Sequence, residues 1–319
     1  MKITVVSLNP CIDWQLTTPN FEYGALNHVM PVGRYAAGKG INVAIALKNL
    51  GLDPKCIGFN YRENGAELTR TMKDHGVRHD FVNVDGVLRT NIKLYDTSNS
   101  TMTELNQPGP PVSSQELAQL YNKVNVEAKR RPQTKSHILV LSGSLPAGVP
   151  SNFYRTLCEC WTGFVILDAT GEALRLALEG TRLPFCIKPN LYELESTFNV
   201  KFHTKKDIAS FCIDLLRRHN VSMACVSMGA EGAMLICALG EAYYMPAMDL
   251  DVRGVQGAGD SMVAGLTYGV SLGVPDADLL RMACAAAAAT VVREGTQMCT
   301  HDGFTQFMNQ LPQLERINL

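Results

Sequence analysis

A short run of small residues, Gly257-Ala258-Gly259-Asp260, leads directly into an apolar stretch over residues 261–272. A small-residue turn that opens a helix leaves backbone N–H groups free, and with the positive end of the helix dipole these groups bind an anion such as a phosphate. A carboxylate beside that anion hole suits removal of a proton from a hydroxyl while the hole holds a phosphoryl group in transfer. The run therefore predicts a catalytic site, with Asp260 as the base and Gly257, Ala258 and Gly259 in the anion hole. Taken alone, the same residues also suit a glycine-rich loop in which Asp260 is the N-cap of the helix.

Strand-like and helix-like segments alternate along most of the chain. Residues 3–8 predict a strand, and residues 40–50 predict a helix with apolar side chains on one face. Further strands are predicted at 138–142, 164–168, 185–188 and 224–227, with helical segments such as 151–160 and 206–219 between them. This alternation predicts a parallel sheet with helices on both faces.

Two segments, residues 11–32 and 88–105, interrupt this alternation. Each contains a short polar–apolar strand pattern, at residues 14–17 and 91–95, and neither lies in a β-α-β unit. We expect the two segments to pair into a small sheet that covers the edge of the main sheet as a lid. The chain is therefore predicted to form a single domain over residues 1–319 with a discontinuous β lid.

Polar residues follow the ends of several predicted strands. In open α/β sheets, ligands bind beyond the carboxyl ends of the strands, so these residues are expected to meet at one edge. They are Asn9, Asp13, Ser142, Ser144, Asp168, Lys188, Asn190, Glu193, Ser227 and Gly229. Each of them alone has an ordinary role as a cap or turn residue. A Gly38-Lys39-Gly40 step opens the first helix and adds N–H groups and an ammonium, which suit a sugar hydroxyl or a phosphate.

Composition narrows the classes of partner. The chain has 319 residues, is 46% hydrophobic and has a formal net charge of −1, which argues against a nucleic-acid or membrane-surface partner. No uninterrupted apolar run approaches the roughly 20 residues that a membrane span needs. The ten cysteines are scattered and suit no common zinc pattern, so we expect a reducing, cytoplasmic location. The P-loop and dinucleotide-binding patterns are both absent, so a bound nucleotide is not held in either of these ways. The missing dinucleotide pattern also weighs against an oxidoreductase.

Several motifs occur together in one order along the chain. They are Leu8-Asn9-Pro10 with Asp13, Gly38-Lys39-Gly40-Ile41-Asn42, Arg89-Thr90-Asn91-Ile92-Lys93, Ser142-Gly143-Ser144-Leu145-Pro146, Lys188-Pro189-Asn190 with Glu193, Val226-Ser227-Met228-Gly229, Gly257 to Ser261, and Glu294-Gly295-Thr296. With these motifs the chain resembles the ribokinase-like superfamily, in its phosphofructokinase-B branch. The resemblance implies a three-layer α/β/α fold with a mostly parallel central sheet and a small β-sheet lid. It also implies ATP-dependent phosphorylation of a sugar phosphate.

The resemblance further implies a role for each matching residue. It assigns Asp260 as the base and residues 257–260 as the anion hole. The substrate-binding positions it implies are Asn9, Asp13, Gly38, Lys39, Asn42, Arg89, Asn91, Ser142 and Ser144, and the Arg89 guanidinium suits a bidentate grip on the phosphate. The nucleotide-binding positions are Lys188, Asn190, Ser227, Gly229 and Gly259. Glu193 and Asn190 are expected to hold Mg²⁺ through water, and two copies of the chain are expected to dimerise through their lids.

Departures from the family pattern affect the cofactor more than the base. Arg253-Gly254 replaces the usual hydroxyl-bearing step near a monovalent-cation site, and Gln256 replaces a small apolar residue before the anion hole. The expected cofactors are therefore ATP and Mg²⁺, with K⁺ as a further cofactor that these departures put in doubt.

The motifs favour D-fructose 1-phosphate as the substrate and fructose 1,6-bisphosphate as the product. Tagatose-6-phosphate kinases share nearly all of these motifs, so tagatose 6-phosphate stays open as an alternative, and a fructose 6-phosphate kinase of the same branch is less favoured. A sugar-phosphate sensor that has lost catalysis is a further alternative. An intact Asp260 and anion hole argue against it, because a sensor has no use for a base aimed at the transferred group.

Overall fold

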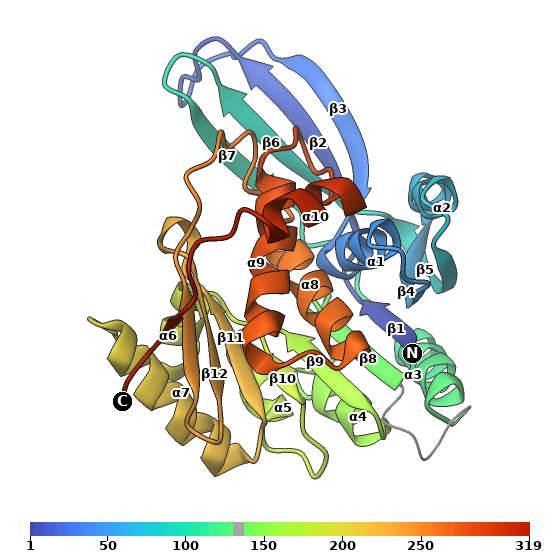
Figure 1. The fold of residues 1–319 in the computed structure, drawn as a ribbon. Helices are drawn as coiled ribbons and strands as arrows, with labels where there is room; N and C mark the ends of the chain where they lie inside the picture. Colours follow the sequence, from blue (N-terminus) through green and yellow to red (C-terminus); the bar gives the residue numbers. More distant parts are fainter. Residues whose placement is uncertain (130–136) are drawn as a thin grey trace.

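A computed structural model describes residues 1–129 and 137–319 of the chain. The larger of its two sheets has ten strands in the order β14-β13-β12-β11-β10-β9-β8-β1-β4-β5 (Figure 1). Neighbouring strands are parallel from β5 to β11. At the other end, β11 to β14 pair antiparallel. The predicted α/β class and mostly parallel sheet are thus confirmed, and the antiparallel end is a feature that the sequence analysis did not include.

The central strands are mostly apolar because both of their faces are covered. All six residues of β8 are buried, which is the pattern expected of a parallel strand between two layers of helices. The bounds of the sheet strands are β1 Lys2–Ser7, β4 Lys55–Glu63, β5 Arg78–Val87, β8 His137–Ser142, β9 Phe164–Asp168, β10 Cys186–Ile187, β11 Met223–Ser227, β12 Ala233–Cys237, β13 Ala242–Met245 and β14 Glu315–Arg316.

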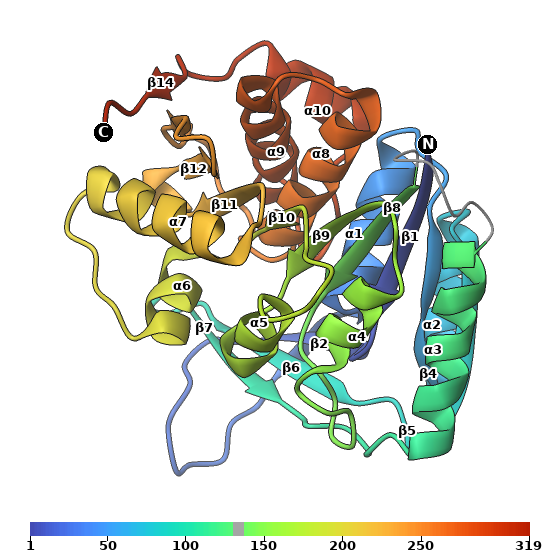
Figure 2. The ribbon, with the colours of Figure 1, turned by 90° about the horizontal axis from the view of Figure 1, so that it is seen from below.

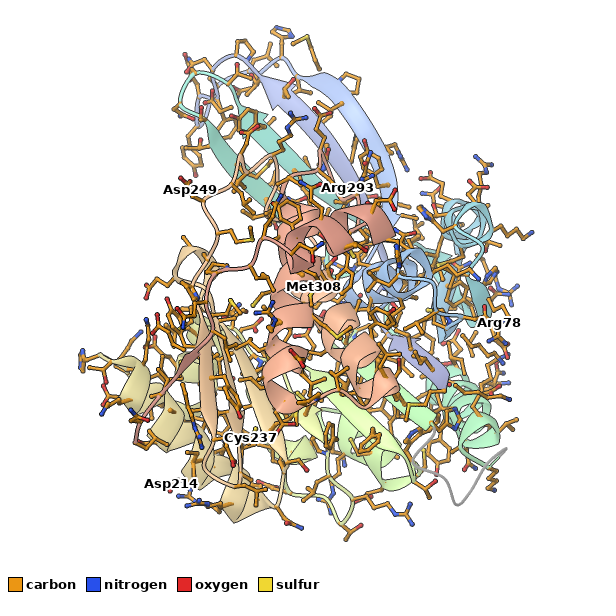
Figure 3. All side chains as sticks on the ribbon, viewed as in Figure 1. Arg78, Asp214, Cys237, Asp249, Arg293 and Met308 are labelled. Atoms are coloured by element: carbon orange, nitrogen blue, oxygen red, sulfur yellow. The ribbon has the colours of Figure 1, made fainter. Side chains whose placement is uncertain are left out.

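Helices cover both faces of this sheet (Figure 2). One layer contains α1, α8 and α9, which pack against one another and against the sheet. The opposite layer contains α3, α4, α5, α6 and α7. Side chains fill the space between the layers (Figure 3). The helix bounds are α1 Lys39–Asn49, α2 Gly65–Asp74, α3 Ser114–Lys129, α4 Phe153–Glu159, α5 Gly171–Ala177, α6 Leu191–Phe198, α7 Lys205–His219, η1 Gly229–Glu231, α8 Ala258–Leu272, α9 Asp276–Val291 and α10 His301–Met308.

A second sheet, which we call the lid, has four strands in the order β3-β2-β6-β7. Its strands are β2 Cys11–Thr18, β3 Met30–Ala37, β6 Thr90–Asp96 and β7 Thr101–Asn106. The lid projects from one edge of the main body (Figure 1). The sequence analysis placed the first lid segment at 11–32, but β3 continues to Ala37, because its pairing with β2 extends to Cys11.

The helices of residues 1–129 and 137–319 include none that is long and apolar enough to cross a membrane.

Candidate active site

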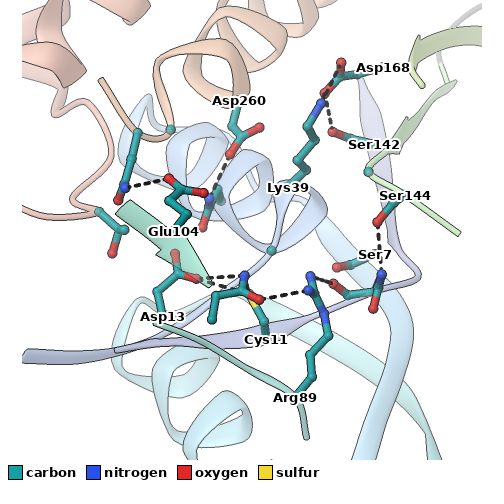
Figure 4. Close-up of a pocket in the computed structure, with 18 of the residues that line it drawn as sticks. Ser7, Cys11, Asp13, Lys39, Arg89, Glu104, Ser142, Ser144, Asp168 and Asp260 are labelled. Atoms are coloured by element: carbon teal, nitrogen blue, oxygen red, sulfur yellow. Dashed lines mark hydrogen bonds and ion pairs between the residues drawn. The ribbon is translucent and has the colours of Figure 1, made fainter. Parts of the chain in front are cut away.

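Two cavities meet beyond the carboxyl ends of the central strands, beside the start of α8. The first has a volume of about 450 Å³ and lies between the lid and the main sheet (Figure 4). The second has a volume of about 1200 Å³ and is lined by residues of α6, η1, α9 and the loop before α8. Five residues line both cavities: Lys39, Asp168, Glu193, Gly257 and Asp260. A group that passes from a ligand in one cavity to a ligand in the other crosses this junction.

A tight glycine turn forms the start of α8. Gly257 is the N-cap residue and has a φ of 77°, a left-handed conformation that glycine adopts with little strain. A Cβ atom at this position would lie 2.3 Å from Cε of Met298. The N–H of Ser261 donates to the Gly257 carbonyl and makes the first i to i−4 hydrogen bond of the helix. The N–H groups of residues 258–260 come before this bond and have no such partner within the helix. Asp260 is the third residue of α8 and therefore is not its N-cap.

The carboxyl group of Asp260 is poised to titrate near neutral pH. Asp260 is only 7% exposed. Burial and the nearby carboxylate of Asp168 raise the pKa of Asp260 to about 6. The ammonium group of Lys39 and a 2.7 Å hydrogen bond from Nδ2 of Asn42 to Oδ2 oppose this rise by favouring the ionised form. Asn42, on α1, thus lies beside the base, whereas the resemblance implied a contact with the sugar.

Asp168, at the end of β9, is the most deeply buried charge at the junction, at 1% exposed. Its Oδ2 lies 3.2 Å from Nζ of Lys39 and accepts a 2.9 Å hydrogen bond from Oγ of Ser142. Its Oδ1 lies 3.5 Å from Nζ of Lys188. Burial opposes ionisation of Asp168, but the two ammonium groups outweigh it and hold the pKa of this carboxyl below its usual value. Asp168 was not among the predicted site residues, although its place at a strand end was a signal for it.

Asn190 and Glu193 form a capping box at the start of α6. The N–H of Glu193 donates to Oδ1 of Asn190 at 2.7 Å, and the N–H of Asn190 donates to Oε2 of Glu193 at 2.8 Å. The other carboxylate oxygen, Oε1 of Glu193, lies 3.7 Å from Nζ of Lys39. Both residues line the larger cavity. The cap thus fixes Glu193 with one oxygen at the junction.

This arrangement fits a magnesium ion held through water. Mg²⁺ keeps most of its waters and takes one or two carboxylates, and Oε1 of Glu193 and Oδ2 of Asp168 both lie beside Nζ of Lys39 at the junction. Residues 1–129 and 137–319 contain no group of three or more His, Cys, Asp or Glu side chains that could hold a metal directly.

The lid supplies one wall of the smaller cavity. Asp13 of β2 is held from three sides: Nζ of Lys93 lies 2.7 Å from Oδ2, Nδ2 of Asn91 donates to Oδ1 at 3.2 Å, and Sγ of Cys11 lies 3.4 Å from Oδ1. Burial raises the pKa of the Cys11 thiol to about 12, so the thiol keeps its proton and donates it. Lys93 and Cys11 were not among the predicted site residues. Both lie in motifs around predicted residues, and only the strand pairing shows that they face the cavity.

The opposite wall lies where β1 and β8 end. Nδ2 of Asn9 donates to Oγ of Ser144 at 2.9 Å, while Oδ1 of Asn9 is buried with no hydrogen-bond partner among the described residues. Gly38 also lines this cavity, and its φ is 128°. A Cβ at Gly38 would lie 3.0 Å from Cα of Pro10, so this glycine allows the loop between β1 and β2 to approach the start of α1 closely.

Arg89 is held by the chain around it. Its Nε donates to the Pro10 carbonyl at 3.2 Å, and its Nη2 donates to the Asn9 carbonyl at 3.1 Å. Its Nη1 donates to Oδ1 of Asn91 at 2.9 Å and to the Gln107 carbonyl at 3.1 Å. A guanidinium has five N–H donors, and these bonds to described residues occupy four of them. A bidentate grip on phosphate therefore requires Arg89 to give up at least one of these bonds.

The remaining predicted nucleotide residues line the larger cavity. Lys188 follows β10, Ser227 ends β11, and Gly229 begins η1 with a φ of 60°. An isolated bridge pairs Asn190 with Ser227, which brings the two strand ends together. The rest of the wall is largely apolar and includes Met248, Val252, Val255, Met262, Ala287 and Val291. This wall suits a flat heterocycle, and the polar end of the cavity suits phosphates.

Comparison with known proteins agrees with this geometry. The family model of pfkB carbohydrate kinases matches residues 2–302. The chain belongs to the pfkB family of carbohydrate kinases. This pfkB kinase is 33% identical to the 1-phosphofructokinase of Escherichia coli K12 over 297 residues, which cover 91% of each chain. It is 31% identical to the 1-phosphofructokinase of Bacillus subtilis over 315 residues, 97% of each chain.

The fold of this pfkB kinase is also similar to a solved structure. Phosphofructokinase-2 from Escherichia coli, in complex with potassium, superposes with a TM-score of 0.88 at 26% identity, covering 97% of this chain and 98% of that one. The predicted family, fold class and sugar-kinase activity are therefore confirmed. A kinase of this family transfers a phosphoryl group from ATP to a small carbohydrate acceptor.

Proposed function

We propose that the protein is a 1-phosphofructokinase, which converts D-fructose 1-phosphate and ATP to fructose 1,6-bisphosphate and ADP. The observation that carries the proposal is the junction of the two cavities at Asp260 and the start of α8. The smaller cavity is polar and suits a sugar phosphate, and the larger one suits a nucleotide. The names of the curated relatives at 31–33% identity support fructose 1-phosphate as the acceptor.

Asp260 acts as the base in this proposal. Its carboxylate takes the proton of the C6 hydroxyl as that oxygen forms a bond to the γ-phosphorus of ATP. The bond from the γ-phosphorus to the bridging oxygen breaks, and its electron pair leaves with ADP. Gly257, Ala258 and Gly259 hold the phosphoryl oxygens at the start of α8, where N–H groups and the helix dipole stabilise negative charge. Phosphoryl transfer needs this alignment more than covalent help from the protein.

Lys39 and Lys188 neutralise charge on the phosphates in this proposal. The Lys39 ammonium lies at the junction between Asp168 and Glu193. It therefore faces the transferred group in addition to the sugar position that the resemblance implied. Lys188 is held by Asp168 on the nucleotide side, together with Ser227 and Gly229.

Mg²⁺ is part of the proposal. Glu193 and Asn190 would hold it through water, and bound Mg²⁺ would neutralise the charge that develops on the phosphates. Asp168 lies beside them and keeps the two lysines in place.

The sugar and its phosphate would occupy the smaller cavity. Asp13 and Asn91 face the sugar hydroxyls from the lid, and Gly38 and Ser142 face them from the main sheet. Ser144 and Arg89 lie away from Asp260 (Figure 4), and Asn9 contacts both of them; the existing phosphate would bind there.

Potassium is a further proposed cofactor. The loop before α8 is joined to the last residue of α9 by a 2.8 Å bond from the Arg253 N–H to the Val291 carbonyl. The carbonyl oxygens of Gly295 and Arg293 would lie 3.3 and 3.5 Å from a Cβ at Gly254, so carbonyls converge on this glycine. Backbone carbonyls are the ligands that K⁺ prefers. We expect kcat/KM to be higher in KCl than in NaCl at equal ionic strength, and equal rates in the two salts would remove K⁺ from the proposal.

We also propose that two copies of the chain dimerise through the lid. The lid strands and the loop between β2 and β3 expose several large apolar side chains, namely Tyr23, Leu26, Met30, Val32, Met102 and Leu105. Large exposed apolar patches mark interaction sites, and we assign these six side chains of the lid to the dimer contact.

One experiment tests the proposed substrate. Initial rates with Mg·ATP are measured in parallel for fructose 1-phosphate, tagatose 6-phosphate and fructose 6-phosphate, and kcat/KM is compared. A clear preference for fructose 1-phosphate is the expected result. A preference for tagatose 6-phosphate would replace the substrate and keep the mechanism, whereas binding without turnover would favour the sensor.

A further inference from the structure

A buried ion pair lies in the wall of the sugar cavity. Nζ of Lys93, on β6, is 2.7 Å from Oδ2 of Asp13, on β2, and their side chains are only 8% and 6% exposed. Both residues line the cavity. Buried ion pairs are a poor source of stability, because the cost of removing two charges from water offsets their attraction. The two strands are also already joined by backbone pairing, with Asp13 opposite Asn91.

The ion pair fixes the direction of the Asp13 carboxylate. Oδ2 faces Lys93, while Oδ1 accepts from Nδ2 of Asn91 and lies beside the thiol of Cys11. A carboxylate has about four acceptor positions. With three donors recorded among the described residues, one position is left for a ligand in the cavity. A hydroxyl of a sugar is a donor of the right kind.

The charge of Lys93 matters because the cavity is rich in acids. Its wall contains five carboxylates, from Asp13, Glu104, Asp168, Glu193 and Asp260, and three cations, from Lys39, Arg89 and Lys93. Lys39 pairs with Asp168 at the junction, so it does not serve Asp13. Without Lys93, the Asp13 carboxylate would face a dianionic sugar phosphate with its charge unbalanced.

The pairing of the lid strands places Lys93 near two carboxylates, those of Asp13 and Glu104, and its ammonium pairs with Asp13. Lys93 lies directly opposite Glu104 of β7 in the strand register. Glu104 instead accepts a 3.2 Å hydrogen bond from Nε2 of Gln256, just before the anion hole. The ammonium is thus committed to Asp13.

We propose that Lys93 is a positioning residue for the sugar phosphate, acting through Asp13: it balances the Asp13 charge and aims the carboxylate at a sugar hydroxyl. The inference rests on the proposed function in that the ligand is a sugar phosphate, and it adds a residue to which no role had been given.

The test measures dissociation constants by isothermal titration calorimetry, so that turnover is not required. The probes are fructose 1-phosphate, tagatose 6-phosphate and fructose 6-phosphate, with Mg·ATP titrated separately. For the sugar phosphate that the wild type binds most tightly, Lys93→Met is expected to raise Kd by about tenfold or more, the scale of one lost charged hydrogen bond. The Kd of Mg·ATP is expected to change by less than about twofold, because none of the described lid residues lines the larger cavity. Lys93→Arg is expected to restore most of the affinity for the sugar phosphate.

A matched control separates positioning from stability. Lys55, the first residue of β4, forms a 2.8 Å ion pair with Glu127 at the amino ends of the strands, away from both cavities. Lys55→Met is expected to lower Tm and leave the Kd of the sugar phosphate unchanged. If Lys93→Met behaves in the same way, with a lower Tm and wild-type affinity, the proposal is overturned.

A double-mutant cycle tests whether Lys93 acts through Asp13. In an Asp13→Asn background, Lys93→Met is expected to have little further effect on Kd, because the partner charge is already gone. Fully additive effects would show that Lys93 acts independently and would overturn the inference. A wild type that prefers another sugar phosphate in the rate comparison changes the proposed function, whereas the cycle, run with that sugar phosphate, still decides the role of Lys93.

Discussion

At the scale of single residues, the proposed reaction depends on the carboxylate of Asp260. Its surroundings raise its pKa to about 6, so it is ionised at pH 7 and yet basic enough to accept a proton. A base is most effective when its pKa lies near the working pH. The neighbours that set this balance, Asp168 and Asn42, come from opposite sides of the site.

Asp260→Asn tests the base directly. The amide is nearly the same size but cannot take the proton, so kcat is expected to fall by about 10² or more. The Kd values of sugar phosphate and Mg·ATP are expected to stay close to those of the wild type. Turnover that survives the change would contradict the assignment of Asp260.

The pH dependence of kcat/KM offers a second test. Asp260 must be ionised to act, so below its pKa of about 6 the rate is expected to fall about tenfold per pH unit. Asn42 donates to the ionised carboxylate; Asn42→Ala removes that bond, raises the pKa and moves the acid limb to higher pH. The measurement is kcat/KM from pH 5 to 8, and an acid limb that does not move in Asn42→Ala would count against this role of Asn42.

Individual residues show how much of the candidate site could be predicted from the sequence. The run at 257–260 led to a prediction because small residues and an aspartate at a helix start suit an anion hole with a base. The same residues also suited a loop with Asp260 as the N-cap, and only the structure shows that the N-cap is Gly257. Asp168 was noticed at a strand end and still left out of the predicted site, because a single aspartate gives no sign that two lysines converge on it. Arg89 was expected to be free for phosphate, but four of its donors go to Asn9, Pro10, Asn91 and Gln107. Such contacts between distant segments are a property of the fold.

At the scale of elements, α8 is the part whose placement matters most. Its first turn points at the junction of the cavities, and its N-cap Gly257 is left-handed and packed against Met298. The last turn ends on a second left-handed glycine, Gly273, with open space around it. The same helix therefore provides a site glycine and a matched control.

Gly257→Ala and Gly273→Ala are expected to differ in activity. Both introduce a Cβ at positive φ, which costs about 1–2 kcal/mol of unfolding free energy. Only Gly257→Ala also pushes against Met298 and shifts the anion hole, so its kcat is expected to fall by about 10², while Gly273→Ala keeps wild-type kcat. Chemical denaturation and steady-state rates measure both, and equal kcat values for the two variants would contradict the anion hole.

The elements also show which parts of the fold are visible in a sequence. The parallel strands β1, β8, β9 and β11 were predicted because each is a short, mostly apolar run. The strand β3, from Met30 to Ala37, was largely missed: it is mostly exposed, and Pro31 and Gly33 interrupt its pattern. The antiparallel pair β12 and β13 follows β11 without a helix, so alternation alone gave no reason to expect it.

At the scale of the whole molecule, the lid is predicted to join two copies. Val32, on the edge strand β3, is exposed, so Val32→Glu places a charge in the proposed interface. Light scattering after gel filtration is expected to give twice the chain mass for the wild type and a shift toward the chain mass for Val32→Glu. Leu239→Glu, at an exposed site in the turn between β12 and β13, is expected to leave the mass unchanged. A wild type that elutes as a monomer would contradict the lid interface.

The lid contributes side chains to the smaller cavity but not to the described wall of the larger one. Lid strands supply Cys11, Asp13, Asn91, Lys93 and Glu104 to the smaller cavity, whereas the described wall of the larger one comes from the main body. Donor and acceptor recognition are therefore expected to be separable, with substitutions in the lid altering which sugar is accepted and leaving the proposed ATP site intact. Laboratory selection for a new acceptor is accordingly expected to concentrate its substitutions in β2, β6 and β7. Exchanging lids between relatives is expected to exchange their acceptor specificity.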